Sequence, residues 1–181
     1  MIEEKYFKEF PRLETERLLL RQISLKDAPD IQDIRSNEQV MSFMDSHRHT
    51  SVEDAENFIE EGLRIYEAKN GLFWGLEEKA TGEFIGDLSF WKIDKKNCRA
   101  EIGYTLKPEF WGSGYMKEAM LRIFDFGFND LKLHSLEANI NPKNENSRGI
   151  LLRLGFKKEA YFRENFFFNG EFLDSEIYSL L

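Results

Sequence analysis

The segment Lys107–Leu121, KPEFWGSGYMKEAML, has the residue spacing that most directly suggests a chemical role. Two glycines, Gly112 and Gly114, stand just before an apolar pattern of helical period. Glycine lets a ligand approach the backbone closely, and the first turn of a helix has N–H groups without internal partners at the positive end of the helix dipole. The segment therefore fits a site for an anion, usually a phosphate. A plain glycine turn between a strand and a helix is the alternative.

Backbone N–H groups along this segment are the candidate phosphate ligands. They belong to Trp111, Gly112, Ser113, Gly114, Tyr115 and Met116. The loop that binds nucleoside triphosphates needs a Lys-Ser or Lys-Thr pair after its second glycine, where Tyr115 and Met116 stand. The dinucleotide loop needs a third glycine, where Lys117 stands, so a nucleotide-binding regulator is the weaker hypothesis. Lys117 could itself approach a phosphate or be a solvated lysine.

Hydrophobic periodicity predicts the elements that position this segment. Strands are predicted at 17–23, 71–78, 83–94, 98–106 and 135–141, and the C-terminal segment is predicted to form a hairpin that turns at Asn169-Gly170. Helices are predicted after Ser24, after Thr50, at 116–128 and within 144–156. Ser24 with Asp27, and Thr50 with Glu53, have the spacing of helix-capping boxes.

The order of these elements predicts an α+β fold, with a mixed central sheet of about seven strands flanked by helices. Strands 71–78, 83–94 and 98–106 follow one another through short turns, which indicates an antiparallel meander. The helix at 116–128 connects strand 98–106 to strand 135–141, and such a crossover makes those two strands parallel. We expect a single domain over residues 1–181, with its core at about 14–181, because no linker is visible.

Composition limits the classes of partner. The chain has 181 residues and a net charge of −8, which argues against a nucleic-acid partner and suits a cationic one. It has no apolar stretch of membrane-spanning length and no signal-peptide pattern. Its single cysteine, Cys98, fits a reducing cytoplasm. We expect a cytoplasmic monomer or homodimer that does not contact a membrane.

The glycine segment resembles the pyrophosphate loop of the GNAT family of N-acetyltransferases, Gln/Arg-x-x-Gly-x-Gly/Ala. Gly112 and Gly114 match this loop, whereas Glu109 stands at its first position, as in the branch of ribosomal-protein N-terminal acetyltransferases (RimJ/RimL type). Three further segments resemble that branch in the same order along the chain. They are ETERLLLRQI (14–23), AEIGYTL (100–106) and NENSRGILLRLGF (144–156).

This resemblance implies the GNAT fold, with a splayed parallel strand pair at the site of the cosubstrate acetyl-coenzyme A. It implies an amine acceptor, such as a protein N-terminus or a polyamine, and no metal. Backbone groups of Tyr104, Thr105 and Leu106 would pair with the pantetheine arm, or with an ordinary neighbouring strand. Asn144 would bond the pantetheine region, cap the helix that follows it, or do both.

The resemblance also suggests catalytic residues. The tyrosine that serves many of these enzymes as general acid is replaced by Leu151, and Ser147 is the candidate acid of the ribosomal-protein branch. Ser147 lies on one helical face with Asn144, Leu151 and Leu154, so a helix-start hydrogen bond is its alternative role. Glu101, on the strand face opposite Ile102 and Tyr104, is the candidate base or a structural acceptor.

Weaker candidates for the base are Glu38, Asp45 and Asp87. Cys98 has no local histidine signature for covalent catalysis, and His47 and His49 have no cysteine or carboxylate that completes a metal-ligand set. The main hypothesis is therefore an N-acetyltransferase that acts by direct attack in a ternary complex. A coenzyme A-binding module without turnover is the alternative, because the usual tyrosine acid is absent.

Overall fold

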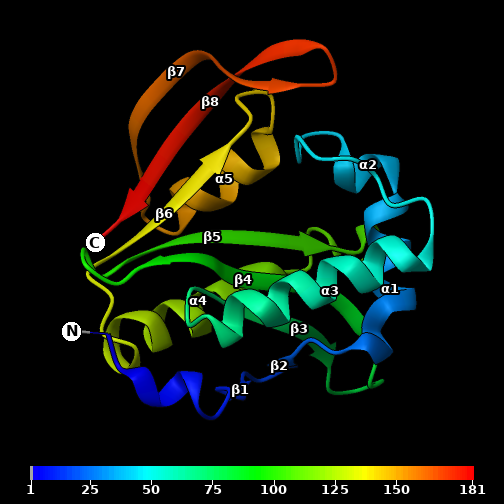
Figure 1. The fold of residues 1–181 in the computed structure, drawn as a ribbon, viewed down its shortest axis with the longest axis vertical. Helices are drawn as coiled ribbons and strands as arrows, with labels where there is room; N and C mark the ends of the chain where they lie inside the picture. The colour runs from blue at the N-terminus through cyan, green and yellow to red at the C-terminus, as the bar shows by residue number, and fades with distance from the viewer. Residues whose placement is uncertain (1) are drawn as a thin grey trace.

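The computed structural model, which describes residues 2–181, is organised around an eight-stranded sheet (Figure 1). The strands lie in the order β1-β2-β3-β4-β5-β6-β8-β7, and only β5 and β6 are parallel. Their bounds are Leu13–Glu14 (β1), Leu18–Gln22 (β2), Leu72–Glu78 (β3), Phe84–Asp94 (β4), Arg99–Leu106 (β5), Ser135–Ile140 (β6), Lys157–Phe168 (β7) and Glu171–Leu180 (β8). The predicted α+β fold, meander and crossover are confirmed, and the short β1 makes eight strands rather than about seven.

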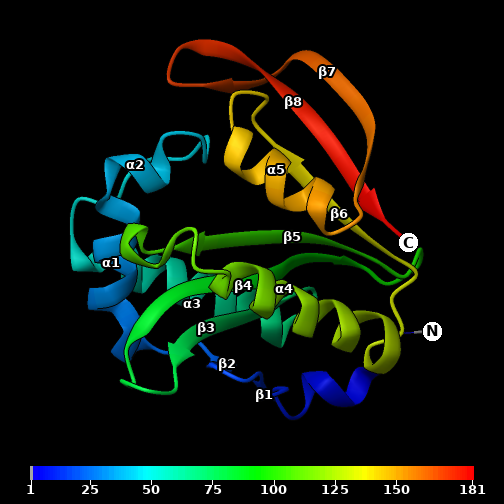
Figure 2. The same ribbon diagram turned by 180° about the vertical axis from the view of Figure 1, so that it is seen from behind.

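Helices cover both faces of this sheet. α1 (Ala28–Ser36) and α3 (Val52–Glu67) lie on one face, whereas α4 (Tyr115–Asp125) and α5 (Glu145–Arg153) lie on the other (Figures 1 and 2). Shorter helical segments are α2 (Glu38–Met41), the 3₁₀ turns Glu4–Phe7, Leu25–Asp27 and Pro108–Phe110, and a π-helical turn, Phe126–Asp130, that continues α4. Of these, α2 and the 3₁₀ turns Glu4–Phe7 and Pro108–Phe110 were not predicted, because each spans about a single turn with no measurable period.

The core on the α4 face fixes where α4 begins. Met116, Ala119, Met120 and Ile123 recur at helical spacing, and all four are buried against the sheet. Burial of such an apolar face is the main source of helix stability in a protein. The N-terminus of α4, which follows the glycine segment, is therefore held in a set position at the edge of the core.

The parallel pair β5–β6 is short and then opens. Its register pairs run from Arg99–Ser135 to Glu101–Glu137 and stop there, after which the two strands diverge (Figure 1). On the other side of β5, strand β4 has a bulge at Trp91, where the register passes from Phe90–Ile102 to Lys92–Glu101. The bulge lies level with Glu101, where β5 begins to part from β6. Bulges increase the local twist of a strand, which is consistent with the parting at this point.

The C-terminal hairpin turns where the sequence predicts. Asn169 and Gly170 both have positive φ, at 51° and 84°. A two-residue hairpin loop of type I′ requires this conformation at both central positions, and the Asn-Gly pair supplies it. β8 thereby lies between β6 and β7 and completes the sheet beyond the gap.

The start of α3 differs from the prediction by one residue. Ser51, not Thr50, is the N-cap, and Asp54, not Glu53, reaches back to it. Ser51 Oγ accepts from Asp54 N at 3.3 Å, and Asp54 Oδ2 accepts from Ser51 N at 3.1 Å and from Thr50 N at 2.7 Å. Both pairs fit the same sequence pattern, so only the backbone conformation decides between them. The box at Ser24 and Asp27 is confirmed.

None of the helices within residues 2–181 combines the length and the apolar character needed to cross a membrane.

The corrected cap gives a stability prediction. Ser51→Ala should lower the free energy of unfolding by about 1 kcal/mol, because it removes the acceptor for an otherwise unpaired helix N–H group. The exposed Glu53 makes no capping bond, so Glu53→Gln is the matched control and should leave the urea midpoint unchanged. Urea denaturation of both variants is the measurement, and a larger loss from Glu53→Gln would contradict the observed cap.

Candidate functional site

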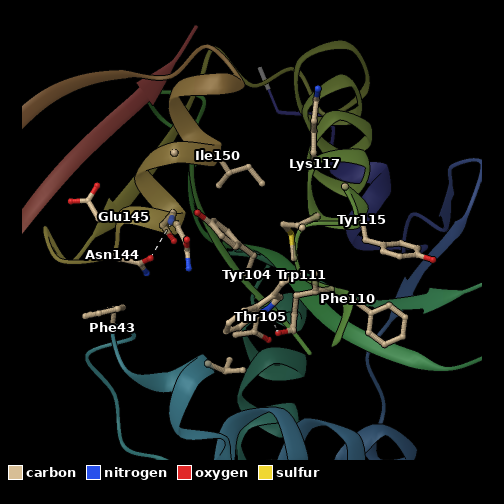
Figure 3. Close-up of a pocket in the computed structure, with 18 of the residues that line it drawn as sticks. Phe43, Tyr104, Thr105, Phe110, Trp111, Tyr115, Lys117, Asn144, Glu145 and Ile150 are labelled. Atoms are coloured by element: carbon tan, nitrogen blue, oxygen red, sulfur yellow. Dashed lines mark hydrogen bonds between the residues drawn. The ribbon is translucent and has the colours of Figure 1, made fainter. Parts of the chain in front are cut away.

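One cavity of about 680 Å³ lies where β5 has parted from β6 (Figure 3). Its walls come from the second half of β5, the glycine segment with the start of α4, the start of α5, and α2 with the turn after it. Ten of the predicted site residues line it, namely Tyr104, Thr105, Leu106, Trp111, Gly112, Gly114, Tyr115, Met116, Asn144 and Ser147. Lys117 lines it too, whereas Ser113 and Glu101 do not. The structure thus brings together residues from three separate segments.

The glycine segment has the backbone conformation that only glycine adopts readily. Gly112 and Gly114 have φ values of 72° and 83°, in the left-handed region. Gly114 is the N-cap of α4, and the first intrahelical bond runs from Glu118 N to Gly114 O at 3.0 Å. The N–H groups of Tyr115, Met116 and Lys117 therefore have no acceptor within the helix and are available to an anion.

Arg17, at the start of β2, holds this segment from its outer side. Its Nη1 donates to the Ser113 carbonyl oxygen at 3.0 Å, and its guanidinium carbon lies 4.0 Å from the centre of the Tyr115 ring. In a trans peptide the C=O and the next N–H point in opposite directions. Because Arg17 binds the Ser113 carbonyl oxygen, the N–H of Gly114 points away from Arg17.

A carboxylate on α4 fixes Arg17 in turn. Glu118 accepts from Arg17 Nε at 2.7 Å and from Arg17 N at 2.9 Å, and the Thr15 hydroxyl donates to it as well. Burial alone would raise the pKa of Glu118, but the bonds from Thr15 and Arg17 keep it below its usual value. The charged pair therefore joins the N-terminal strand to the first turn of α4.

The backbone of β5 is open toward the cavity. Residues 102–106 pair with β4 on one side, but pairing with β6 has already ended at Glu101. Strand backbones carry N–H and C=O groups toward both sides, so this stretch presents unpaired groups to the gap. An extended, peptide-like ligand could pair with them, as a further strand would.

Tyr104, on β5, and Ser147, at the start of α5, are neighbours in the lining of the cavity. The Tyr104 ring rises from β5, and its hydroxyl points toward α5 (Figure 3). Burial raises the pKa of Tyr104 to about 12, and the nearby Ser147 hydroxyl lowers it by a smaller amount. Asn144 caps α5, because its Oδ1 accepts from Ser147 N at 3.0 Å, and this confirms the capping role that the sequence allowed.

Glu101 lies outside the cavity lining, at the point where β5 and β6 part. Its side chain is on the strand face opposite Ile102 and Tyr104, and it stands level with Glu137 of β6. Burial, followed by the negative charge of Glu137, raises the pKa of Glu101 above its usual value. A carboxyl group with a raised pKa beside a gap is suited to accepting a proton.

The three other carboxylates make different contacts. Asp87 is buried and accepts from the Thr105 hydroxyl, and burial raises the pKa of Asp87. Asp45 accepts from the Asn141 side chain at 3.0 Å, which ties the turn after α2 to the end of β6. Glu38 is exposed and lies 3.7 Å from Arg48. None of them lines the cavity, and neither does Glu101. Glu101 differs from them in its place at the point where β5 and β6 part.

Sequence reasoning missed the contacts of Arg17. Arg17 was only part of a strand motif, and its partner Glu118 lies 101 residues away. Phe43, in the turn after α2, also lines the cavity. No local pattern signals these contacts, because each depends on how the strands and helices pack.

The family comparison agrees with this geometry. A family profile described as "Acetyltransferase (GNAT) domain" matches residues 17–157. An uncharacterized N-acetyltransferase of Bacillus subtilis, YoaA, is 37% identical over 172 residues, which cover 95% of this chain and 97% of that protein. A crystal structure titled as a probable acetyltransferase superposes with a TM-score of 0.83 at 29% identity, covering 94% of this chain and 97% of the other.

Two more distant relatives have names that state their acceptors. The alanine N-acetyltransferase of ribosomal protein uS5 from Escherichia coli is 27% identical over 93% of this chain and 90% of its own length. The spermidine N(1)-acetyltransferase of Vibrio cholerae is 25% identical over 87% of this chain and 89% of its own length. The named acceptors of these relatives thus differ in chemical class.

The Arg17 contacts give a prediction for the glycine segment. Arg17→Met should speed amide hydrogen exchange at Gly112–Met116 by about tenfold, because it removes a charge-assisted bond to the Ser113 carbonyl. Arg21→Met is the matched control, since Arg21 is on the same strand but pairs with Asp27 and Glu77. Exchange followed by mass spectrometry should show no change at Gly112–Met116 in the control. Equal exchange in both variants would show that Arg17 does not hold the segment.

Proposed function

The chain belongs to the GNAT family of N-acetyltransferases, and from this we propose that it transfers acetyl from acetyl-coenzyme A to a primary amine by direct attack in a ternary complex. One observation carries the proposal. A helix N-terminus with free N–H groups and a strand edge with unpaired backbone groups open onto the same cavity. Coenzyme A presents the matching pair of features, a pyrophosphate and a peptide-like pantetheine arm.

The chain's residues fit that cosubstrate. The N–H groups from Trp111 to Met116 would hold the pyrophosphate, and Tyr104 to Leu106 would pair with the pantetheine arm. Acetyl-coenzyme A supplies an acyl group activated as a thioester. Neither Gly112 nor Gly114 has a Cβ, and both have the positive φ that keeps the first-turn N–H groups exposed. No observation favours a coenzyme A-binding module that lacks turnover.

Two residues are proposed to move or hold protons. Glu101, on the strand face opposite Tyr104, would accept the proton that the attacking ammonium must lose, directly or through water. Ser147, at the start of α5, would donate toward the departing sulfur. The cavity reaches from the α4 face to α2 through the gap beside β5, so the amine and the cosubstrate can enter from different sides.

The acceptor is proposed to be cationic, either a protein N-terminus or a polyamine. The net charge of −8 favours such a substrate over an anionic one. Relatives named for a ribosomal-protein alanine and for spermidine support both choices. A screen of peptides, polyamines and amino acids with acetyl-coenzyme A, read by thiol release, would separate them.

Ligand preference tests the proposed function. Coenzyme A and acetyl-coenzyme A should raise the melting temperature, whereas ATP and NAD at equal concentration should raise it far less. The reason is that Tyr115, Met116 and Lys117 stand where the two nucleotide loops need other residues. Thermal shift is the measurement, and preferential stabilisation by ATP or NAD would overturn the assignment.

A variant of the glycine segment localises this binding. Gly114→Val should weaken coenzyme A binding at least tenfold, because a β-branched residue is strained at φ of 83° and its Cβ would lie 3.5 Å from Arg17 Nη2. Gly82→Val is the matched control, because Gly82 has φ of 74° and open space around it, in the turn between β3 and β4, and does not line the cavity. Calorimetry should show normal binding in the control, and normal binding in both variants would exclude the loop.

The raised pKa of Glu101 gives a pH prediction. Glu101→Gln should lower kcat/KM for the amine by about 10²–10⁴-fold. The deficit should be largest between the raised pKa of Glu101 and the pKa of the amine, where the wild-type group is a carboxylate and the amine is protonated. Below the raised pKa the wild-type enzyme loses its base as well, and above the amine pKa no base is needed.

Ser147→Ala provides the comparison, and it should cost less because a thiolate departs readily without strong acid help. Steady-state rates across pH, with the acceptor found by the screen, are the measurement. Wild-type rates for Glu101→Gln at every pH would reassign Glu101 to a structural role.

A further inference from the structure

An unpartnered hydroxyl group marks one wall of the cavity. Within residues 2–181, three buried side-chain atoms have no hydrogen-bond partner of ordinary geometry: Arg35 Nε, His49 Nδ1 and Tyr104 Oη. Of these residues only Tyr104 lines the cavity. Buried polar groups are almost always paired in native proteins, so an exception in a ligand cavity requires an explanation. A ligand atom that completes the pairing is the direct one.

The surroundings of the hydroxyl narrow the choice of ligand atom. Tyr104 lies on β5 beyond the last pair with β6, and its hydroxyl points toward the start of α5 (Figure 3). Ser147, the neighbouring hydroxyl on α5, is close enough to lower the pKa of Tyr104 but makes no hydrogen bond of ordinary geometry with it. Asn144 Oδ1 is occupied as the helix cap, which leaves Nδ2 of Asn144 as a further donor. The carbon skeleton of Leu151, fully buried one turn further along α5, offers no donor. Two hydroxyl groups, from β5 and α5, therefore share this wall of the cavity.

We propose that the Tyr104 hydroxyl donates a hydrogen bond to the sulfur of coenzyme A and stabilises the thiolate as it leaves. The proposal rests on the proposed function, and it adds a side-chain role to a residue that otherwise contributes its backbone. In this proposal the hydroxyl of Tyr104, on β5, lies near the sulfur. It takes the place of the tyrosine that many GNAT enzymes have on the helix where this chain has Leu151. Ser147 assists from the other side of the same sulfur.

The bond and proton changes balance without a further reactant. The amine nitrogen forms a bond to the acetyl carbon and gives one proton to water, while the bond from that carbon to sulfur breaks and sulfur keeps the electron pair. Tyr104 retains its own proton, because the pKa of Tyr104, about 12, lies well above that of a thiol, about 8.5. The released thiolate takes one proton from water. A donor that stays protonated contributes most when the sulfur is charged, since hydrogen bonds to ions are stronger than those to neutral groups.

The thiol pKa of bound coenzyme A tests this contact without an acceptor amine. Ultraviolet absorbance of the thiolate, titrated in the complex with coenzyme A, gives that pKa for each variant. Tyr104→Phe should raise it by about one to two units relative to the wild type, and Ser147→Ala by less. Tyr161→Phe, which removes a hydroxyl bonded to Asp174 on the far hairpin, is the matched control and should leave it unchanged. The other ionisable side chains of the cavity, Lys117, Glu145, Arg153 and Tyr115, are the same in all variants.

Two further measurements separate the loss of this contact from a folding defect in the variant. Tyr104→Phe removes one buried, unpaired oxygen, so the melting temperature of the unliganded variant should equal or exceed that of the wild type. Binding of coenzyme A at a pH where its thiol is neutral should change by no more than about twofold, because the hydroxyl contacts only the sulfur. The same thiol pKa in wild type and Tyr104→Phe would overturn the proposal and leave the proposed function intact. Failure of the wild type to bind coenzyme A would overturn both.

Discussion

The divergence of β5 from β6 is the constraint on which the rest of the structure depends. A parallel pair must be joined by a crossover, so the helix α4 that connects these strands lies across the sheet and begins at the open end of the pair. The pairing stops after three register positions, which leaves half of β5 without a neighbour on that side. The same opening carries α5 and the hairpin β7–β8 away from the rest of the sheet (Figure 1). Unpaired backbone, a helix N-terminus and a cavity thus arise together from a single topological feature.

Charged pairs hold the walls of this opening while leaving its hydrogen-bond donors free. Arg17 holds the glycine segment from outside, and Lys107 anchors the chain where β5 ends, through bonds of 3.1 Å to Asp30 and 3.0 Å to Glu83. Burial alone would lower the pKa of Lys107, but Glu83 and Asp30 raise it, so Lys107 remains charged. Partly buried pairs of this kind are screened less by salt than exposed ones. The segment is therefore fixed by groups that do not compete with a ligand for its N–H donors.

Sequence patterns predict the elements well and the contacts between them poorly. The meander, the crossover and the Asn-Gly turn each have a local signal, in hydrophobic period or turn chemistry, and all three are confirmed. The cap at Ser51 was placed one residue early because two overlapping pairs of residues satisfy the same pattern. The bulge at Trp91 and the Arg17–Glu118 pair have no local signal, since each exists only after distant segments pack. Positions on strands and helices can thus be inferred, but the side chains that support the site cannot.

Strand alternation separates the proposed base, Glu101, from the proposed hydrogen-bond donor, Tyr104. Glu101 and Tyr104 are three residues apart on one strand, so their side chains lie on opposite faces of the sheet. The proposed base and the proposed hydrogen-bond donor are thus kept from bonding to each other, and burial raises the pKa of each group separately. The unpaired edge of β5 begins at the residue after Glu101 and includes Tyr104. In the proposed reaction, the amine would lose its proton on one face of this strand, and the sulfur would leave on the other.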